Sequence, residues 1–332
     1  VHMEGIYIPF LKLIEEGKVN ETLIAMIRAN TRLPVDTVGD TYSLAACNDV
    51  GCQRLTEMMS EFDLDDLDDL STYICERSEA TVREEIAALP KGSWSNTMVT
   101  DGYDSPIELT ATVTVSDDGI HVDYTGTSPV AARGINVPIS YTTAYTVFGL
   151  ACVVGRNVPN NAGSLAPLTV SAPEGCILNA PKPAPVCSRH VIGQMLPDVV
   201  FGCLRPAVPD RGPAEGTSCL WNLNVRGRMM GGEGGLSGLS LRVTSIGGAG
   251  RMRGGHGQNI EIESRIGEPF ELLAAYDRID HPARGRDGGK DGAPGVVAFK
   301  SGKTLPGKGF LMVPADERLV IKTPGAVSYT HL

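Results

Sequence analysis

The chain has 332 residues, a mass of 35.2 kDa and a formal net charge of -10, with 42% hydrophobic and 20% charged residues. This composition provides a sizeable core and excludes wholesale disorder, while 5% aromatic residues argue against a base-stacking surface for nucleic acid. The 39 glycines and 22 prolines favour many turns over a helical bundle.

The cellular location is predicted from what the sequence lacks. No apolar stretch approaches the roughly 20 residues of a membrane-spanning helix, and no charged and then apolar leader opens the chain. The eight cysteines are scattered and form no C-x-x-C pair, which is typical of reduced thiols in a cytosolic protein. We therefore expect a cytoplasmic protein that binds neither membranes nor nucleic acid.

Residues 1–92 are predicted to form a helical segment. Apolar side chains recur mostly every three or four residues over 38–62, which indicates a long helix with one apolar face. A second helix is expected over 70–89, where Pro90 and Gly92 follow.

An acidic stretch joins these two helices. Residues 61–85 contain ten acidic and two basic side chains. We expect the acids to form the wet face of a helix whose Leu64, Leu67 and Leu70 point inward.

Residues 93–225 are predicted to form a mixed α/β core. Apolar and polar residues alternate over 107–115 and again over 120–124, and the turn residues Ser116-Asp117-Asp118-Gly119 separate them, which predicts an antiparallel hairpin. We expect a buried helix over 142–154 and another apolar helix over 188–204. Short strands are expected over 168–170 and 176–178.

The remainder is predicted to be a glycine-rich β region over 226–325, followed by a tail over 326–332 that looks non-native. The chain shows helices first and sheet later, without a repeating strand–helix–strand pattern. This order predicts the α+β class.

Motif searches exclude several kinds of site. Gly302-Lys303-Thr304 resembles the end of a P-loop, but Val297 stands where the first glycine is needed. The segment 248–254 is one residue too long for a dinucleotide-binding motif. Leu220 replaces the last glycine of a nucleophile elbow, and the six histidines have no metal-binding spacing. The sequence therefore predicts no nucleotide or metal site in this chain.

A polar stripe on the helix expected over 188–204 is the first candidate site. His190, Gln194 and Asp198 are spaced four residues apart, so they would share one face of an otherwise apolar helix. The stripe either lines a wet cavity or forms hydrogen bonds to neighbouring loops. His190 and Asp198 are therefore candidates for proton transfer or orientation.

Two polar loops supply the other candidates. Glu215 is predicted as a catalytic residue, and Thr217, Ser218 and Asn222 are predicted to order the substrate. Arg133 and Asn136 are expected opposite them, in the loop 133–138. The sequence alone does not show that these residues converge.

Several segments, in order, resemble the hydantoinase B family. They are 4–9, 39–40, 123–129, 134–138, 161–163, 172–175 and 247–255. The segment 189–198 resembles the branch labelled N-methylhydantoinase B. The resemblance covers most of residues 4–325.

The resemblance implies a B subunit of an ATP-dependent cyclic-amide hydrolase, or half of a fused 5-oxoprolinase. In that family ATP binds to a hydantoinase A-type subunit, which phosphorylates the cyclic amide or a carbonyl oxygen, and the B subunit then completes ring opening. The alternatives are a subunit of an acetone or acetophenone carboxylase, or a non-catalytic scaffold for the A-type subunit. ATP is thus expected on the partner, with no cofactor bound by this chain.

Three features depart from the family pattern. The family carries N-D-P-Y, H-x-x-D and H-H-x-D-x-G, which resemble a divalent-metal site, before the segment that corresponds to 4–9. This chain starts just before that segment, so we expect the metal in a part outside it and expect the fragment alone to be inactive. The family is also longer between Asn224 and Gly247, with 231–235 as a remnant here, and the tail after Gly325 differs from the family's glycine-rich end.

Overall fold

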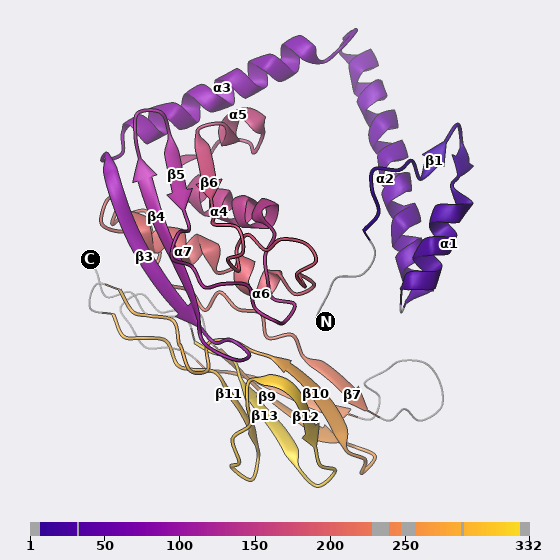
Figure 1. The fold of residues 1–332 in the computed structure, drawn as a ribbon, viewed down its shortest axis with the longest axis vertical. Coiled ribbons are helices and arrows are strands. Elements are labelled where there is room, and N and C mark those ends of the chain that lie inside the picture. Colours follow the sequence, from indigo (N-terminus) through magenta and orange to yellow (C-terminus); the bar gives the residue numbers. More distant parts are fainter. Residues whose placement is uncertain (1–6, 32, 228–238, 247–256, 287–288, 326–332) are drawn as a thin grey trace. The chain divides into compact units, whose positions relative to one another are not determined.

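A computed structural model describes residues 7–31, 33–227, 239–246, 257–286 and 289–325 (Figure 1). The chain separates into an N-terminal unit, residues 3–77, and a main unit, residues 78–332 with 1–2. The division lies within helix α3 (Asp68–Ala87). The domain boundaries predicted from composition remain predictions. The glycine-rich segments 231–235 and 248–254 and the tail 326–332 lie outside the described residues.

The N-terminal unit is a strand pair followed by helices. Strands β1 (Ile14–Glu15) and β2 (Lys18–Val19) pair antiparallel, and α1 (Glu21–Asn30) and α2 (Pro34–Glu61) follow. The side chain of Asn20 caps α1 by accepting a hydrogen bond of 3.1 Å from the backbone N–H of Leu23. The small core of this unit consists of Leu23, Ile24, Ile27 and Val38.

The acidic connection between α2 and α3 is a turn, so the helix predicted through Leu64 and Leu67 is wrong. Residues 62–67 are not helical; Leu64 and Leu67 are half-buried and Leu70 is exposed. The Asp66 side chain accepts a hydrogen bond from the N–H of Asp68, and aspartates favour such turns because they compete with helical backbone bonds. The two helices predicted on either side are confirmed by α2 and α3.

A four-stranded sheet lies at the centre of the main unit. It contains β3 (Gly92–Thr100), β4 (Ile107–Val115), β5 (Ile120–Asp123) and β6 (Leu168–Ser171), in that order. The predicted hairpin is confirmed, because Val115 pairs with Ile120 and Thr112 with Asp123. Strand β6 is parallel to β5. The alternation in β4 buries every second side chain, so one face of the sheet belongs to the core.

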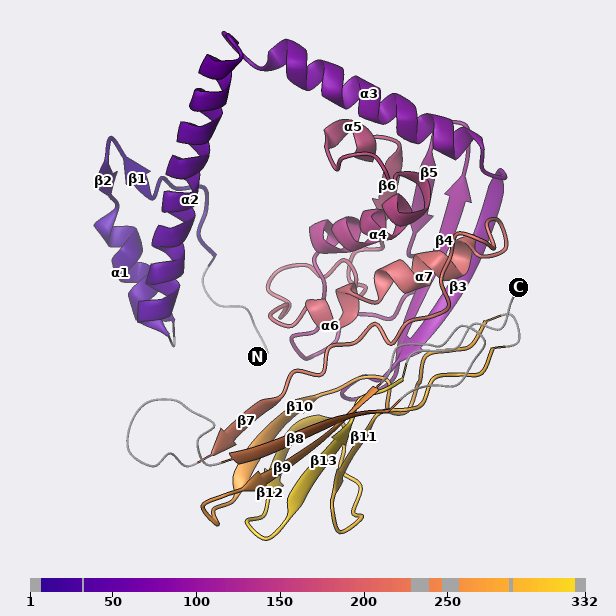
Figure 2. The same cartoon turned by 180° about the vertical axis from the view of Figure 1, so that it is seen from behind.

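Two helices cover that face of the sheet. They are α4 (Ile139–Val154) and α7 (Leu196–Leu204), which lie side by side (Figures 1 and 2). The predicted buried helix over 142–154 is confirmed by α4. Two shorter helices accompany them, α5 (Ala162–Leu165) and α6 (His190–Gly193). None of the helices in the described part of the chain has the length and hydropathy of a membrane span.

The single helix predicted over 188–204 is wrong, because the chain forms α6 and then α7. Pro197 lies in the first turn of α7, where its missing N–H is tolerated, and a proline ring clashes with the carbonyl four residues earlier. His190, Gln194 and Asp198 therefore do not share one helix face. The strand predicted over 176–178 is also absent, since Cys176 forms only an isolated bridge with Pro129.

The C-terminal part confirms the predicted β region and the α+β class. Its strands are β7 (Asn224–Gly227), β8 (Leu239–Ile246), β9 (Gly257–Ser264), β10 (Phe270–Ala275), β11 (Val296–Phe299), β12 (Lys308–Val313) and β13 (Arg318–Lys322). They form two sheets, ordered β12-β10-β7 and β11-β13-β9-β8. Phe270 and Leu272 from the first sheet share one core with Val297, Leu319 and Ile321 from the second.

Candidate functional site

A buried glutamate lies where the loop after α7 meets the loop after β10. The Glu215 side chain is inaccessible to solvent and lies between two guanidinium groups. Its Oε1 lies 3.0 Å from Nη1 of Arg278, and its Oε2 accepts a hydrogen bond of 2.8 Å from Nε of Arg284. A buried carboxylate is costly unless it is paired, so these contacts determine how the two loops meet.

Arg278 lies between these two loops and contacts both of them. It is fully buried, and its backbone φ of 67° lies in the left-handed region that is unfavourable for a side chain of this size. Its Nε donates to the carbonyl of Thr217 at 3.0 Å, and its Nη1 donates to the carbonyl of His281 at 3.4 Å. The fixed fork of the guanidinium group thus joins the loop after α7 to the loop after β10.

Asp198 lies beside this pair, in the first turn of α7. Its side chain is 7% exposed and accepts a hydrogen bond of 3.2 Å from the N–H of Gly216, and the hydroxyl of Ser218 donates to its other oxygen. Burial raises the pKa of Asp198 to about 6, although the Gly216 N–H and the charge of Arg286 act in the opposite direction. This carboxyl group therefore titrates close to neutral pH.

Arg286 connects Asp198 to the same loop. Its Nη2 donates to the backbone carbonyl of Asp198 at 3.1 Å, and its Nη1 donates to the carbonyl of Pro213 at 2.8 Å. Burial lowers the pKa of Arg286, while Asp198 and Glu215 raise it. The site therefore combines two buried carboxyl groups with three guanidinium groups on one loop.

A second buried carboxylate, that of Asp101, follows the end of β3 and is held by several hydrogen-bond donors. The buried Asp101 accepts backbone hydrogen bonds from Ile279 at 2.7 Å, Asp280 at 3.3 Å and His281 at 3.0 Å. Nδ1 of His281 also lies 2.7 Å from Asp101 Oδ1. A carboxylate that holds an imidazole in this way fixes its orientation and tautomer.

A third set of charges joins Asp277 to the sheet. Lys308 Nζ lies 2.8 Å from Asp277 Oδ2, and Thr100 donates to Oδ1 at 3.3 Å. Burial raises the pKa of Asp277, and Lys308 opposes this shift. Lys308 and Arg133 both lie over the ring of Tyr103, at 5.2 and 5.9 Å from its centroid. This set therefore connects β12, the loop after β3 and the loop 133–138.

The structure brings four of the eight predicted site residues together. Asp198, Glu215 and Ser218 surround Gly216, and Thr217 contributes its carbonyl to Arg278. Arg133 is exposed and lies over Tyr103, outside this group.

The other three predicted residues lie apart from this group. His190 is half-buried at the start of α6 and forms no side-chain hydrogen bond or ion pair with the described residues. Asn222 is exposed. The side chain of Asn136 is buried and bonds to Ala131, Arg133 and Pro185, so all its polar groups hold the loop.

The predictions missed the partners of the buried acids. Arg278, His281, Arg284 and Arg286 all come from the segment 277–286, which contains five charged residues and a histidine among ten positions. In a chain with 20% charged residues, such a density within the predicted β region was an available signal. The sequence does not show which acid each cation contacts.

The described residues do not fit a metal ion. Within the described ranges, no three His, Cys, Asp or Glu side chains converge, and Asp101 with His281 is only a pair. Stable metal sites in proteins usually need three or four such ligands. No step of the chemistry is therefore assigned to a metal held by these residues.

Known proteins have sequences similar to most of this chain. An uncharacterized protein of Methanocaldococcus jannaschii is 28% identical over 372 residues, which is 99% of this chain and 65% of that protein. A protein named as the B component of a D-/L-hydantoinase from Pseudomonas sp. (strain NS671) is 31% identical over 63% of this chain and 38% of its own length. 5-Oxoprolinase 1 of Arabidopsis thaliana is 26% identical over 97% of this chain and 30% of its own length. The chain thus spans less than two thirds of these relatives.

Two solved structures share the fold. The ATP-dependent caprolactamase from Pseudomonas jessenii matches with a TM-score of 0.77 and 20% identity, over 98% of this chain and 67% of that one. A nucleotide-free acetone carboxylase matches with a TM-score of 0.68 and 11% identity, over 96% and 56% of the two chains.

The family model described as hydantoinase B/oxoprolinase matches residues 1–240 and 236–331, which together make up almost all of the sequence. The order of the motifs and the fold agree with this match, and we conclude that the chain belongs to the hydantoinase B/oxoprolinase family.

Proposed function

We propose that this chain is part of the B subunit of an ATP-dependent cyclic-amide hydrolase of the hydantoinase/5-oxoprolinase type. The family match, the relatives named as a hydantoinase B component and as 5-oxoprolinases, and the fold shared with a caprolactamase support this proposal. The substrate class is a small cyclic amide. The protein acts in the cytoplasm, which its eight free cysteines support, because disulfides are rare in reducing compartments.

The partner is a hydantoinase A-type subunit that binds ATP and phosphorylates the carbonyl oxygen of the ring amide. Phosphorylation makes attack of water at that carbon easier; the carbon–nitrogen bond then breaks, and a second water hydrolyses the resulting acyl phosphate to the carboxylate and inorganic phosphate. Ring opening then needs a group that accepts a proton from the water and a proton for the departing ring nitrogen. A carboxyl group with a pKa near the working pH performs such transfers best.

The main support for a catalytic role of this site is the buried carboxyl group of Asp198 with its raised pKa. Its pKa of about 6 allows it to exchange a proton near neutrality, and Ser218 and Gly216 hold it in place. In this proposal Glu215 is a positioning residue, because its two carboxylate oxygens form ion pairs with Arg278 and Arg284. Thr217 and Ser218 order the substrate. His190, Arg133, Asn136 and Asn222 lie apart from this group, and we assign them no step.

We assign ATP to the A-type subunit and a divalent metal to the family's histidine- and aspartate-rich segment, which has no counterpart in the 332 residues. The metal would supply Lewis-acid activation of the reacting oxygen or water. The described residues of this chain contribute the carboxyl groups, the arginines and the fold that positions them. We therefore expect the chain alone to be inactive.

The test combines a B subunit that contains this chain with the A-type subunit, ATP and a divalent metal. Hydantoin, 5-oxoproline and caprolactam are offered separately, and ADP and the ring-opened product are measured. Asp198→Asn is expected to lower turnover about 100-fold, whereas Asp210→Asn, which changes an exposed carboxylate, is expected to leave it unchanged. Ring opening by this chain without partner or ATP would contradict the proposal.

A carboxylase subunit is the second candidate, because the acetone carboxylase shares the fold over 96% of this chain. Turnover of a ketone that depends on bicarbonate, with no ring opening, would favour it. A non-catalytic scaffold for the A-type subunit is the third. Unchanged turnover in the Asp198→Asn complex would favour that role.

A further inference from the structure

The imidazole ring of His281 has one nitrogen bound and one nitrogen free. Its Nδ1 lies 2.7 Å from Oδ1 of Asp101, while Nε2, on the other edge of the ring, has no hydrogen-bond partner among the described residues. The side chain of His281 is 32% exposed, whereas that of Asp101 is 7% exposed. The ring therefore has its Nδ1 edge inside the main unit and its Nε2 edge open.

Asp101 determines which of the two ring nitrogens carries the hydrogen. Its Oδ2 accepts hydrogen bonds from the N–H groups of Ile279 at 2.7 Å and Asp280 at 3.3 Å, and its Oδ1 accepts one from the N–H of His281 at 3.0 Å as well as facing the ring. A carboxylate has about four lone-pair sites, so these donors use all of them. Because a carboxylate only accepts, Nδ1 of His281 donates and Nε2 presents a lone pair.

His281 belongs to the same network of contacts as Asp198. The carbonyl of His281 accepts a hydrogen bond of 3.4 Å from Nη1 of Arg278, and the same Nη1 lies 3.0 Å from Oε1 of Glu215. Gly216, which follows Glu215 in the chain, donates to the Asp198 carboxyl group. An imidazole and a carboxyl group, both able to exchange protons, are thus attached to one buried ion pair.

An imidazole is not needed to hold this loop together. The three backbone N–H groups that Asp101 accepts would fix the segment 279–281 with almost any side chain at position 281. A ring with one nitrogen held by a buried carboxylate and the other nitrogen free is the arrangement that orients a general base in the Ser-His-Asp triad. The geometry of His281 therefore suits proton transfer through Nε2.

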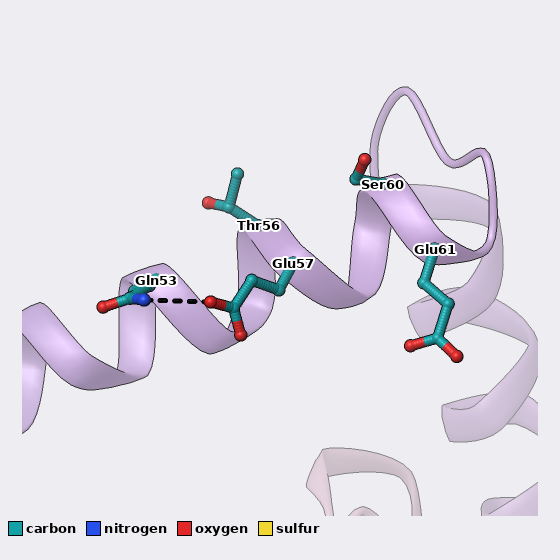
Figure 3. A pocket seen from close by; sticks show the side chains of 5 residues that line it. All are labelled: Gln53, Thr56, Glu57, Ser60 and Glu61. Carbon is teal, nitrogen blue, oxygen red and sulfur yellow. Dashed lines mark hydrogen bonds between the residues drawn. The ribbon is translucent and has the colours of Figure 1, made fainter.

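The hollow on helix α2 is not a comparable site. The residues that line it are Gln53, Thr56, Glu57, Ser60 and Glu61, and Figure 3 shows all five leaving the same stretch of helix. Glu57 already accepts hydrogen bonds from Gln53 at 2.9 Å and from Arg54 at 3.2 Å. A ligand site encloses most of its ligand, and a hollow with one helix as its wall does not.

We propose that His281 is a second catalytic residue of the B subunit, positioned by Asp101 and acting together with Asp198. Its part in ring opening rests on the function proposed above. The free Nε2 and the orientation of the ring are independent of that function, because they follow from the contacts of Asp101 and His281 alone.

The proton transfers balance over the two steps that open the ring. As water adds to the phosphorylated carbon, Nε2 of His281 takes a proton from the water, and the protonated carboxyl group of Asp198 gives a proton to the ring nitrogen. The carbon–nitrogen bond then breaks, and its electron pair leaves with the nitrogen. In this step the new hydroxyl group returns a proton to Asp198, and the imidazolium of His281 gives its proton to the nitrogen. The products are an amine and an acyl phosphate, and both side chains regain their starting states.

The variant His281→Asn separates catalysis from folding. The side-chain N–H of asparagine replaces Nδ1–H as a donor to Asp101, but no atom replaces Nε2. In the complex of the B subunit that contains this chain with the A-type subunit, ATP and a divalent metal, we expect kcat to fall about 100-fold and the urea midpoint of unfolding to stay unchanged. His121→Ala, at an exposed histidine on β5, is the matched control and should change kcat by less than about twofold.

Two further variants test each partner of the pair. Added imidazole should raise kcat of His281→Ala at least about tenfold, because it supplies the missing base, and should not raise kcat of Asp198→Asn. Asp101→Asn removes the acceptor that fixes the ring, so we expect kcat to fall about 100-fold while KM changes by less than about threefold. A rise in KM with unchanged kcat would show that Asp101 does not position a catalytic group.

Chemical modification tests the free nitrogen without any turnover. Diethylpyrocarbonate acylates accessible imidazole nitrogens, and mass mapping of peptides follows each histidine of the B subunit. We expect His281 to be modified within the time in which His121 is modified, although both ring nitrogens of His121 face hydroxyl groups, at 2.8 and 3.0 Å. A His281 that stays unmodified after His121 has reacted would overturn the proposal.

The two proposals fail in different ways. Wild-type kcat in the His281→Asn complex would overturn the role of His281 and leave the hydrolase function intact. A wild-type complex that opens no ring would contradict the proposed function. The same variants are then assayed with a ketone and bicarbonate, since a base must also remove a proton from the carbon next to the ketone carbonyl. Unchanged turnover of His281→Asn in that reaction would overturn the proposal as well.

Discussion

Arg278 and Glu215 form an ion pair of 3.0 Å in which neither side chain is accessible to solvent. The pair connects the loop after α7 to the loop after β10. It therefore links the central sheet and its helices to the C-terminal sheets. Because both charges are removed from water, removing either side chain would leave the other as an unpaired buried charge.

Replacing Arg278 with methionine should strongly destabilise the main unit. Glu215 would keep only Arg284, and the carbonyls of Thr217 and His281 would lose a donor. We expect the free energy of unfolding to fall by about 3 kcal/mol or more. Urea unfolding followed by tryptophan fluorescence measures it, because Trp94 and Trp221 both lie in this unit. Arg156→Met, at an exposed position, is the control, and a loss as small as that of the control would contradict the role of the pair.

The raised pKa of Asp198 should be visible in the pH dependence of the free energy of unfolding. Its pKa is raised from 3.8 to about 6 on folding, so the folded state binds a proton more tightly than the unfolded state. This contribution is fully present below pH 3.8 and is lost as the pH rises through 6, with a total of about 3 kcal/mol.

Asp198→Asn removes this titration and retains an acceptor for Gly216. The stability of the wild type relative to Asp198→Asn should therefore fall between about pH 4 and pH 7. Urea unfolding of both proteins across this range provides the measurement. A constant difference between the two proteins would show that Asp198 has an ordinary pKa.

Removing the Asp101 carboxylate should loosen the segment 279–281. Its oxygens accept three backbone N–H groups and face Nδ1 of His281, so Asp101→Ala leaves these partly buried donors without their acceptor. We expect the free energy of unfolding to fall by about 2–4 kcal/mol and hydrogen exchange at the amides of Ile279 and His281 to become faster. Asp280→Ala removes the neighbouring exposed carboxylate and should change neither quantity. Unchanged exchange in Asp101→Ala would contradict this assignment.

Gly149 allows α4 and α7 to approach closely. A Cβ atom at Gly149 would lie 2.9 Å from Cα of Pro197, which is backbone and cannot move away easily. Gly149→Ala should therefore cost about 1–3 kcal/mol of unfolding free energy. Gly155→Ala, whose Cβ would meet ordinary contacts of 3.7 Å, should cost clearly less. Equal thermal stability of the two variants would show that the helices separate without cost.

Local periodicity predicted the regular elements where one face is buried. Alternation over 107–115 and 120–124 identified the hairpin β4–β5, and the apolar run over 142–154 identified α4. These predictions succeeded because a buried face leaves a pattern within a few residues. The helix predicted over 188–204 failed at Pro197, where a local rule for proline outweighed the apolar pattern.

The sequence predicted only part of the candidate site. The density of polar groups around Glu215 and Ser218 predicted the loop, and Asp198 was predicted for its place on a polar stripe that the structure does not form. Asn136 has the residue type of a substrate ligand, but its side chain holds a turn. Residue type indicates what a side chain can bond to, and only the surrounding backbone decides what it does bond to.

The sequence by itself determined the hairpin β4–β5, helix α4, the α+β class and the family, because these depend on short patterns and ordered motifs. The tertiary structure alone decided that Arg278 and Arg284 enclose Glu215 and that Asp198 is buried enough to titrate near pH 6. Ion pairing, desolvation and exposure arise from residues far apart in the chain, and no local pattern records those distances.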